Sequence, residues 1–336
     1  MTRTATNPDD PELRSQRHAA LGAPANGSVR VGLDVGGTKI DAVAVAPSGE
    51  ILGRLRRPTG WGEDAVVENI LQAVAALAQE NGIALSDIGS VGVGIPGLVD
   101  VETGTVLHAV NLGVASLALA ARAEAAIGIP FRVENDVKAA ALGASVLRGL
   151  TGSMAYLNLG TGVAAGIVID GRIRRGARGT AGEVGHISVD PNGRTCGCGQ
   201  RGCIETFCGG GSLAKAWCRP GALPVKDILD AADAGDAEAI ALRDDLHHGA
   251  AAAVRVLVLS ADVETVIIGG GLTALGARLE DGIRAALRVD AEKSPFMRSL
   301  HLDERIEMLA AGSPAAAFGA ALVGASIPEK EIVFHG

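Results

Sequence analysis

Residues 30–57 contain three short apolar runs, RVGLDVG, TKIDAVAVA and EILGRLRRP, and the turn APSGE separates the last two. Runs of this length with glycine-bearing breaks predict three strands, the last two joined as a hairpin. Between residues 63 and 81 the apolar side chains recur every three to four positions, and NGI follows them. This spacing predicts an amphipathic helix with a C-terminal stop.

Strand and helix patterns then alternate. IGSVGVGIPG predicts a buried strand ending in a loop, and a helix is expected at about 116–127. FRVEN predicts the next strand, and a helix is expected from Asp136 through Leu147. A strand-rich start followed by this alternation is typical of an α/β domain with a mixed sheet.

The pattern then restarts. SMAYLNLGTGVAAGIVIDGRI, residues 153–173, is similar to SVRVGLDVGGTKIDAVAVAPSGEIL, residues 28–52. In each segment an apolar strand ends in a polar residue, Asp34 or Asn158, and a Gly/Thr turn leads into a second apolar strand. The repeat predicts two similar domains that face each other, although two glycine-bearing hairpins could also resemble each other by chance.

The second half predicts further helices and two strands. Helices are expected at about 210–217, 225–234, 237–258 and 272–288, a buried strand at VETVIIGGG and another strand near 305–309. SPAAAFGAALVGA predicts a final helix of small residues at about 314–326. We therefore expect a disordered leader over 1–28, an N-terminal domain over 29–149 and a C-terminal domain over 150–330. The final helix is a candidate to pack back on the N-terminal domain.

Composition and charge narrow the class of protein. The 336 residues are 48% hydrophobic and carry a formal net charge of −8. This charge disfavours nucleic acid and anionic membranes as partners. The first 28 residues lack the apolar region of a secretory signal, and no apolar run reaches membrane-spanning length. We expect a cytoplasmic protein with reduced thiols.

The cysteine loop, residues 182–206 (GEVGHISVDPNGRTCGCGQRGCIET), is the most unusual segment. Five cysteines are an odd number for a disulfide framework in a chain without an export signal. The set His186, Cys196, Cys198 and Cys203 fits tetrahedral zinc, with glycines allowing the tight turns that bring ligands together. An accidental cluster and a disulfide framework remain as alternatives. Cys208 and Cys218 fall outside the spacing and are expected to be structural.

Three glycine-rich turns are candidates for binding phosphate. In LDVGGTKI, the backbone of Gly36 and Gly37 with the hydroxyl of Thr38 suits phosphate oxygens, and Asp34 suits Mg²⁺ held through water. LGTGVAAG repeats the arrangement with Gly160, Thr161 and Gly162. IIGGGL, with Gly269, Gly270 and Gly271, suits a base or ribose close to the backbone. No G-x-G-x-x-G leads into a helix, which disfavours NAD.

Taken in order, DxGGTK, GIPG, END, LGTG and GExGH leading into CxCGxxGCxE resemble the ROK family (repressors, open reading frames, kinases). The resemblance spans about residues 31–325 and is nearest to ATP-dependent sugar kinases of glucokinase type. It implies two α/β domains of ribonuclease-H-like fold, related to actin-like ATPases, around a central cleft. It also implies a hexokinase reaction on the 6-hydroxyl of glucose with ATP and Mg²⁺, a structural Zn²⁺ and a homo-oligomer, a dimer or tetramer.

The resemblance assigns roles to single residues. Asp136 matches the catalytic base, where a plain helix N-cap would be the alternative. Asn111, Asn135, Asp136, Glu183, His186 and Glu205 match positions that contact the sugar. Lys39 joins the phosphate-binding turn of DxGGTK. His186 is expected to bind zinc through one ring nitrogen and to face a sugar hydroxyl with the other.

Two departures from the family's motifs leave the identity of the sugar undetermined. Asp136 is followed by Val137-Lys138 where many family kinases have Ala-Asn, and no tryptophan follows Asn111-Leu112. Lys138 is expected to be a solvated helix residue. N-acetylglucosamine, N-acetylmannosamine and kanosamine remain alternative substrates, and polyphosphate remains an alternative donor. A sugar-responsive regulator is a remote alternative, because the leader lacks the periodicity of a helix-turn-helix domain.

Overall fold

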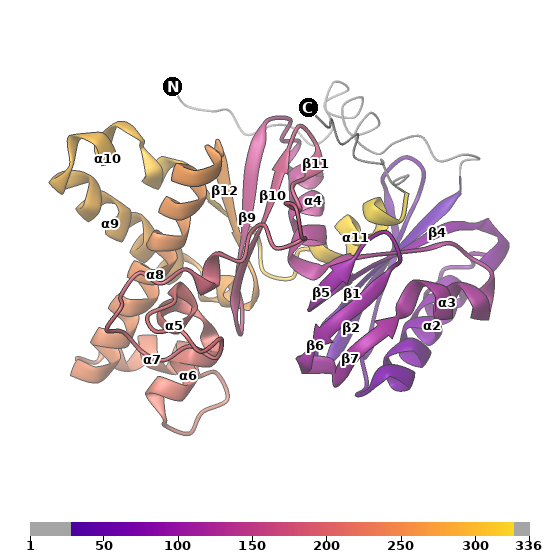
Figure 1. Cartoon of the computed structure of the whole chain (residues 1–336), viewed down its shortest axis with the longest axis horizontal. Helices are drawn as coiled ribbons and strands as arrows, with labels where there is room; N and C mark the ends of the chain where they lie inside the picture. The colour runs from indigo at the N-terminus through magenta and orange to yellow at the C-terminus, as the bar shows by residue number, and fades with distance from the viewer. Residues whose placement is uncertain (1–27, 326–336) are drawn as a thin grey trace. The chain divides into compact units, whose positions relative to one another are not determined.

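The computed structural model describes residues 28–325 of the chain, which fall into two compact units. Unit 1 comprises residues up to 149 together with the segment from 314, and unit 2 comprises residues 150–313. The expected leader lies outside the described residues. Figure 1 shows the elements of both units with their labels.

The main sheet of unit 1 has the strand order β3-β2-β1-β4-β8. The β1–β2 and β2–β3 pairs are antiparallel, whereas the β1–β4 and β4–β8 pairs are parallel. The strands are β1 (Val29–Val35), β2 (Lys39–Val45), β3 (Ile51–Pro58), β4 (Ile88–Ile95) and β8 (Phe131–Asn135). The helices are α2 (Glu63–Glu80), α3 (Leu119–Ile127), α4 (Asp136–Arg148) and α11 (Ala315–Ala325), with the 3₁₀ turn η1 (Leu85–Asp87).

Side-chain alternation along the strands decides which helices cover which face of this sheet. Val31 and Leu33 of β1 point into the core that also contains the buried side chains of α2 and α3. The intervening Gly32 faces α11, and a Cβ atom at that position would lie 1.9 Å from the carbonyl oxygen of Ala317. In β4, Gly92 is equally close to the backbone of α11. Glycine therefore allows α11 to pack directly on the sheet.

Unit 2 repeats this topology with a sheet of order β11-β10-β9-β12-β13. The β9–β10 and β10–β11 pairs are antiparallel, and β12 is parallel to both β9 and β13. The strands are β9 (Ser153–Leu159), β10 (Val163–Ile169), β11 (Arg172–Ile173), β12 (Thr265–Gly269) and β13 (Ile306–Met308). The sequence repeat thus corresponds to two sheets with the same order and strand directions.

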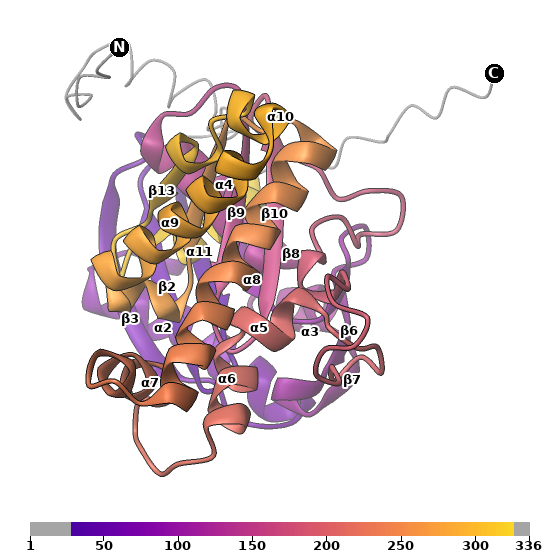
Figure 2. The ribbon, with the colours of Figure 1, turned by 90° about the vertical axis from the view of Figure 1, so that its left-hand side faces the viewer.

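Helices α5, α6, α7 and α9 of unit 2 pack around α8, and α10 packs on α9 (Figure 2). They are α5 (Ile204–Cys208), α6 (Gly210–Trp217), α7 (Pro224–Asp233), α8 (Ala237–Ala261), α9 (Ala277–Lys293) and α10 (Pro295–Ser299). The 3₁₀ turns are η3 (Val184–His186), η4 (Gly271–Leu275) and η5 (Leu302–Glu304). Their apolar faces share one core with β9, β10 and β12.

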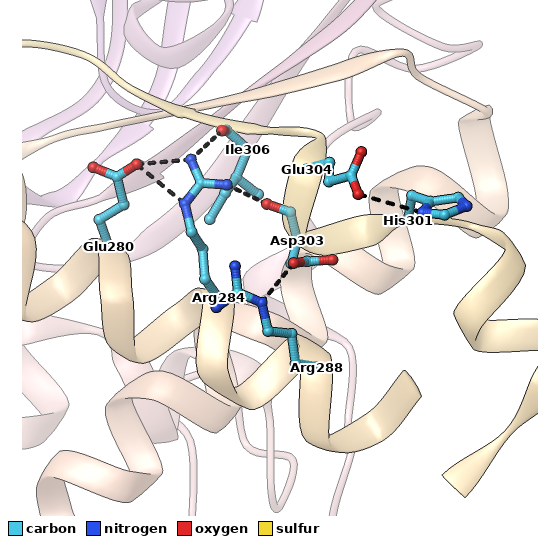
Figure 3. Close-up of polar contacts among 7 residues, drawn as sticks. All are labelled: Glu280, Arg284, Arg288, His301, Asp303, Glu304 and Ile306. Carbon is cyan, nitrogen blue, oxygen red and sulfur yellow. Dashed lines mark hydrogen bonds and ion pairs between the residues drawn. The ribbon is translucent and has the colours of Figure 1, made fainter. Parts of the chain in front are cut away.

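An arginine network joins α9 to the segment before β13 (Figure 3). Arg284 donates to the carboxylate of Glu280 and to the carbonyl oxygens of Asp303 and Ile306. One turn further along α9, Arg288 binds the carboxylate of Asp303 at 2.7 Å. These bonds satisfy one carbonyl oxygen in η5 and one at the start of β13, so they hold β13 at the sheet edge.

The observed elements correct the sequence-based prediction in two places. The helix expected at 116–127 begins only at Leu119, because Val114–Ala118 forms strand β7 against β6. With β5 (Leu98–Asp100), β6 (Thr105–Ala109) and the turn η2 (Val110–Leu112), it forms a small sheet that the pattern did not predict. The helix expected at 272–288 is interrupted at Gly276, whose φ of 60° and ψ of −135° separate η4 from α9.

Candidate functional site

In unit 1, two aspartates lie where parallel strands end. Asp34 on β1 is in register with Gly94 on β4, and Gly94 is in register with Glu134 on β8. Asp136 opens α4 two residues later, and its Cα would lie 3.4 Å from a Cβ atom added to Gly94. The absence of a side chain at Gly94 therefore leaves room for both aspartates at the carboxyl edge of the sheet.

These carboxyl groups affect each other electrostatically. Burial raises the pKa of Asp34 to about 7, and the nearby charge of Asp136 acts in the same direction. Lys39 acts in the opposite direction but does not compensate for burial. A carboxylate with a poorly compensated negative charge is a kind of ligand that Mg²⁺ prefers, and the Mg²⁺ role expected of Asp34 stays a prediction.

Asn135, and not Asp136, is the N-cap of α4. Its Oδ1 accepts hydrogen bonds from the backbone N–H groups of Val137 and Lys138 at 3.1 and 3.2 Å. Its Nδ2 donates to the carbonyl oxygen of Gly97 at 3.4 Å. Asn135 therefore fills the N-cap position, and Asp136 is the first residue of α4, where its Oδ1 also accepts a hydrogen bond from the N–H of Val137 at 2.9 Å.

Lys138 is buried, which corrects the expectation of a solvated side chain. Only 3% of its surface is exposed. The residues on both sides of it, from Val137 to Ala141, are buried as well. The first turns of α4 therefore have no solvated face at this position, which the helical pattern alone does not reveal.

The glycine turn after β1 is fixed by backbone bonds. The N–H of Gly36 donates to the carbonyl oxygen of Lys39 at 2.9 Å, which closes the turn. Gly37, Thr38 and Lys39 are exposed, and Lys39 Nζ lies 3.5 Å from the carboxylate of Asp41. A Cβ atom on Gly37 would lie 3.2 Å from the carbonyl oxygen of Asn111. The exposed Asn111 is thus adjacent to this turn.

In unit 2 the corresponding turn is Gly160-Thr161-Gly162. Gly160 donates to the carbonyl oxygen of Gly162 at 3.1 Å. The carbonyl oxygens of Gly160 and Thr161 accept bonds from the N–H groups of Gly210 and Gly211 at the start of α6, each at 2.8 Å. The turn is therefore held against a helix N-terminus.

Glu205 supports the same turn. Its Oε2 accepts a hydrogen bond from the N–H of Val163 at 2.9 Å. A Cβ atom on Gly162 would lie 2.6 Å from this oxygen, so a larger residue there would displace the carboxylate of Glu205. One carboxylate oxygen of Glu205 is thus already hydrogen-bonded to the backbone of unit 2.

Glu183 and His186 lie on a segment packed along β10. Gly182 accepts a bond from the N–H of Ala165 at 2.7 Å, and a Cβ atom on Gly185 would lie 2.0 Å from the carbonyl oxygen of Val163. Glu183 precedes the turn η3, which ends at His186. The three residues matched to the sugar in unit 2 therefore gather around the start of β10.

The third glycine segment, Gly269–Gly271, follows β12. Gly269 is in register with Asn158. A Cβ atom on Gly270, which has a φ of 89°, would lie 2.5 Å from the carbonyl oxygen of Leu159. The segment therefore lies beside the end of β9, close to the glycine turn that follows β9.

The cysteine loop brings its four candidate ligands together. Among the described residues, one ligand atom from each of His186, Cys196, Cys198 and Cys203 lies within 4.8 Å of the others. Cys198 Sγ and Cys203 Sγ are 3.7 Å apart, and Cys196 Sγ is 3.7 Å from His186 Nδ1. Tetrahedral zinc with its usual bond lengths would separate two sulfurs by about 3.8 Å and a sulfur from a nitrogen by about 3.5 Å. The donor set fits this ion.

The electrostatics of the thiols suit a cation. Hydrogen bonds from the backbone and side chain of Gln200 lower the pKa of Cys198 to about 6. Burial and the neighbouring Cys198 raise the pKa of Cys203 to about 12. A cation bound here would favour the ionised form of both Cys198 and Cys203, which otherwise disfavour each other's ionisation. Cys208 lies in the core of unit 2, where burial raises its pKa, as expected for a structural residue.

The sequence profile of the ROK family matches residues 30–325. The chain belongs to the ROK family. Its α/β fold is that of solved ROK proteins. A ROK hexokinase from Thermus thermophilus is 30% identical and superimposes with a TM-score of 0.73, covering 88% of this chain and 97% of that one. A ROK glucokinase from Streptomyces griseus, solved with glucose and AMPPNP, is 32% identical with a TM-score of 0.71, covering 88% and 99%.

Curated relatives include two kinds of sugar kinase. A glucokinase from Halalkalibacterium halodurans is 34% identical over 270 residues, covering 74% of this chain and 82% of the relative. An N-acetylmannosamine kinase from Yersinia pseudotuberculosis is 31% identical over 261 residues, covering 75% and 86%.

Two residues near the ROK motifs of unit 1 were not singled out by sequence. Thr59 is fully buried and donates from Oγ1 to the carbonyl oxygen of Gly36 at 2.7 Å. Trp61 is 69% exposed and packs against Gly113, two residues after Asn111. Both follow strand β3 in a Pro-Thr-Gly-Trp-Gly segment that has no periodicity, so the only signal was an isolated aromatic in a chain with 2% aromatic residues.

Proposed function

We propose that this ROK protein is an ATP-dependent glucokinase that transfers the γ-phosphoryl group of ATP to the 6-hydroxyl of glucose. The observation that carries the proposal is the position of Asp136, which opens α4 beside Asp34 at the carboxyl edge of the unit 1 sheet. The similarity to glucokinases at 34% and 32% identity supports the choice of reaction and sugar.

Asp136 is the proposed general base. Its carboxylate would accept the proton of the 6-hydroxyl as that oxygen bonds to the γ-phosphorus and the bond from phosphorus to the β–γ bridging oxygen breaks. ADP leaves with the electron pair of the broken bond, and the proton stays on Asp136 until solvent removes it. Asp34 would hold the Mg²⁺ that accompanies ATP, which neutralises the charge of the phosphates.

The remaining predicted residues have proposed binding roles. Asn111, Asn135, Glu183, His186 and Glu205 are proposed to contact the sugar, and Asn135 would do so with its Nδ2 group because Oδ1 caps α4. The two glycine turns, Gly36-Gly37-Thr38-Lys39 and Gly160-Thr161-Gly162, are proposed for the phosphates. Gly269, Gly270 and Gly271 are proposed for the nucleoside.

We propose a structural Zn²⁺ in the cysteine loop. Three sulfurs and Nδ1 of His186 would complete a tetrahedron and leave no position for a substrate oxygen. The ion would fix the ring of His186, so that Nε2 keeps one orientation toward the sugar. We further propose a cytoplasmic, homo-oligomeric enzyme. No helix among residues 28–325 combines the length and apolar character needed to cross a bilayer.

Release of ADP by the zinc-loaded protein tests the function. The acceptors are glucose, mannose, fructose, N-acetylglucosamine, N-acetylmannosamine, glucosamine and kanosamine, with ATP·Mg²⁺ as the donor. Polyphosphate is tested separately by formation of the sugar phosphate, because this donor releases no ADP. We expect turnover of glucose with ATP, and a loss of roughly 10²–10⁴-fold in kcat for Asp136→Asn. Glu102→Gln, an exposed acid on the β5–β6 turn of the same unit, should retain full activity.

An N-acetylmannosamine kinase is the second candidate, because a curated relative of that name is 31% identical. A preference for this sugar over glucose in the same assay would replace the proposal. No turnover of any sugar, with Asp136→Asn indistinguishable from the unaltered protein, would reject the kinase altogether.

A further inference from the structure

Trp61 is a large apolar side chain in an exposed position. It is 69% exposed, and it stands between Gly60 and Gly62, which have φ values of 83° and 88°. One edge of its indole packs on Gly113, where an added Cβ atom would lie 2.6 Å from both Cε2 and Nε1. This contact fixes the ring while most of its surface stays open to solvent.

The residues around Trp61 tie it to two loops of the candidate site. On one side, Thr59 donates from N and Oγ1 to the carbonyl oxygens of Thr38 and Gly36, at 3.3 and 2.7 Å. On the other side, the N–H of Gly62 donates to the carbonyl oxygen of Leu112 at 2.8 Å. Trp61 is therefore held between the glycine turn after β1 and the loop that carries Asn111.

These two loops also contact each other. Gly37 packs against Asn111 so closely that a Cβ atom added to Gly37 would lie 3.2 Å from the Asn111 carbonyl oxygen. The exposed face of Trp61 thus belongs to the same loop cluster as the amide of Asn111. A polar group that hydrogen-bonds and an open aromatic ring, both presented by one loop cluster, are the two kinds of contact that a pyranose needs.

We propose that Trp61 is a sugar-contacting residue whose indole packs on the apolar C–H face of a hexopyranose bound through Asn111. This inference rests on the proposed function and adds a contact that none of the motifs assigned. The C–H groups of a pyranose carry a slight positive charge, and the face of an indole is electron-rich, so the two surfaces attract beyond their buried area.

Fluorescence provides a direct test of this contact, because the chain has two tryptophans. Trp217 is buried in unit 2, with the guanidinium of Arg219 3.8 Å from the centre of its ring. In Trp217→Phe, emission comes from Trp61 alone. Titration with glucose should then change the emission intensity or wavelength in a saturable way. In Trp61→Phe, emission comes from Trp217 alone, and the same titration should give no such change. If Trp217→Phe folds poorly, the test compares Trp61→Phe with the unaltered protein, in which glucose should change the emission.

Steady-state kinetics provide a second readout. Trp61→Ala should raise the KM for glucose about five- to tenfold, with kcat within twofold and the KM for ATP unchanged. Trp61→Phe should restore most of the affinity for glucose, because it keeps an aromatic face. Phe296→Ala removes an aromatic of similar exposure, 61%, from α10 in unit 2 and should change none of these values.

The outcomes separate this inference from the proposed function. One outcome is that the protein phosphorylates glucose while the emission of Trp61 does not respond to glucose and Trp61→Ala has an unchanged KM for glucose. In that case the proposed contact is wrong, but the proposed kinase function is supported. If Trp61→Ala raises the KM for ATP alone, the ring packs on the nucleotide and the inference is also wrong. If the protein neither phosphorylates glucose nor binds it in isothermal calorimetry, the proposed function is wrong, and the inference that rests on it is wrong as well.

Discussion

Asp34 shows how a residue proposed for a binding site can lower the stability of the protein. Burial and the neighbouring Asp136 raise its pKa to about 7, well above its usual value of 3.8. The folded protein therefore binds this proton more tightly than the unfolded chain does. The resulting stabilisation is complete below about pH 4 and is lost as the pH rises to 7, so the ionised carboxylate destabilises the protein at higher pH.

Asp34→Asn should therefore stabilise the protein at neutral pH while abolishing activity. Above pH 7 we expect a higher melting temperature than in the unaltered protein, by an amount that reflects up to a few kcal/mol at about 1.4 kcal/mol per pKa unit. The difference should shrink as the pH falls from 8 to 5 in thermal unfolding without Mg²⁺. Asp100→Asn is a control in which the stability should change in the opposite direction. A hydrogen bond from Thr103 lowers the pKa of Asp100, so the ionised Asp100 stabilises the folded protein. A stability difference that does not vary with pH would contradict the argument.

At this scale the sequence singles out candidate residues but does not reveal how each one is packed or hydrogen-bonded. Asp34 and the four candidate metal ligands were singled out from their motifs and spacing, and Asp136 from the family resemblance. That Asn135 caps α4 and that Lys138 is buried could not be predicted. Both depend on the backbone angles and packing at one helix end, which neighbouring residues in the sequence do not determine.

The cysteine loop has little regular structure of its own. Isolated bridges pair Ser188 with Cys203 and Thr195 with Arg201, and Arg194 holds the carbonyl oxygen of Thr206 at 2.6 and 3.0 Å. From Ile187 to Arg201, Cys196 is the only buried residue, so this part of the loop has few apolar contacts to stabilise one conformation. An ion bound by four of its side chains would provide that stability.

Cys198→Ser should therefore lose zinc and loosen the loop. We expect about one equivalent of zinc per chain in the unaltered protein by colorimetric release, and well under half of that in the variant. The KM for sugar should rise and the melting temperature should fall, because His186 loses its fixed orientation. Cys218→Ser replaces another exposed cysteine and should leave all three values unchanged. Zinc content that survives Cys198→Ser with an unaltered melting temperature would count against the metal site.

Long periodic elements were predictable, and short irregular ones were not. The alternation in β1, β2 and β9 and the spacing in α2 and α8 led to elements close to those observed. The strands β5, β6 and β7 are only three to five residues long and were missed. The break at Gly276 depends on a backbone conformation that glycine permits but does not require.

At the scale of the whole chain, unit 1 is built from two segments that are separated in the sequence by unit 2. Its last helix, α11, packs on β1, β4 and α4 through positions without side chains. Added Cβ atoms at Gly143 and Gly319 would lie 1.9 and 1.8 Å from carbonyl oxygens of the facing helix. These contacts are backbone to backbone, so no side chain can move aside to accommodate a larger residue.

Gly319→Ala should accordingly destabilise unit 1 and leave unit 2 intact. We expect an unfolding transition shifted by roughly 3 kcal/mol or more, because the added methyl group meets backbone atoms of α4. Calorimetry should resolve a second, unshifted transition at which zinc is released. Gly53→Ala on β3 is the matched control, since its methyl group meets only the movable amide of Asn81. A single transition that moves as one would show that the two units unfold together.

The position of α11 also determines the order in which the protein can mature on the ribosome. Translation delivers β1, β4 and α4 first, and their glycine-lined surfaces then remain bare while some 160 residues of unit 2 are synthesised. Domains usually complete in the order in which they emerge. Here unit 2 is fully synthesised before unit 1, although unit 1 begins first. Until α11 has been synthesised, unit 1 exposes an apolar surface that is prone to aggregation. Chaperones that hold nascent chains would therefore act on the N-terminal half of this protein.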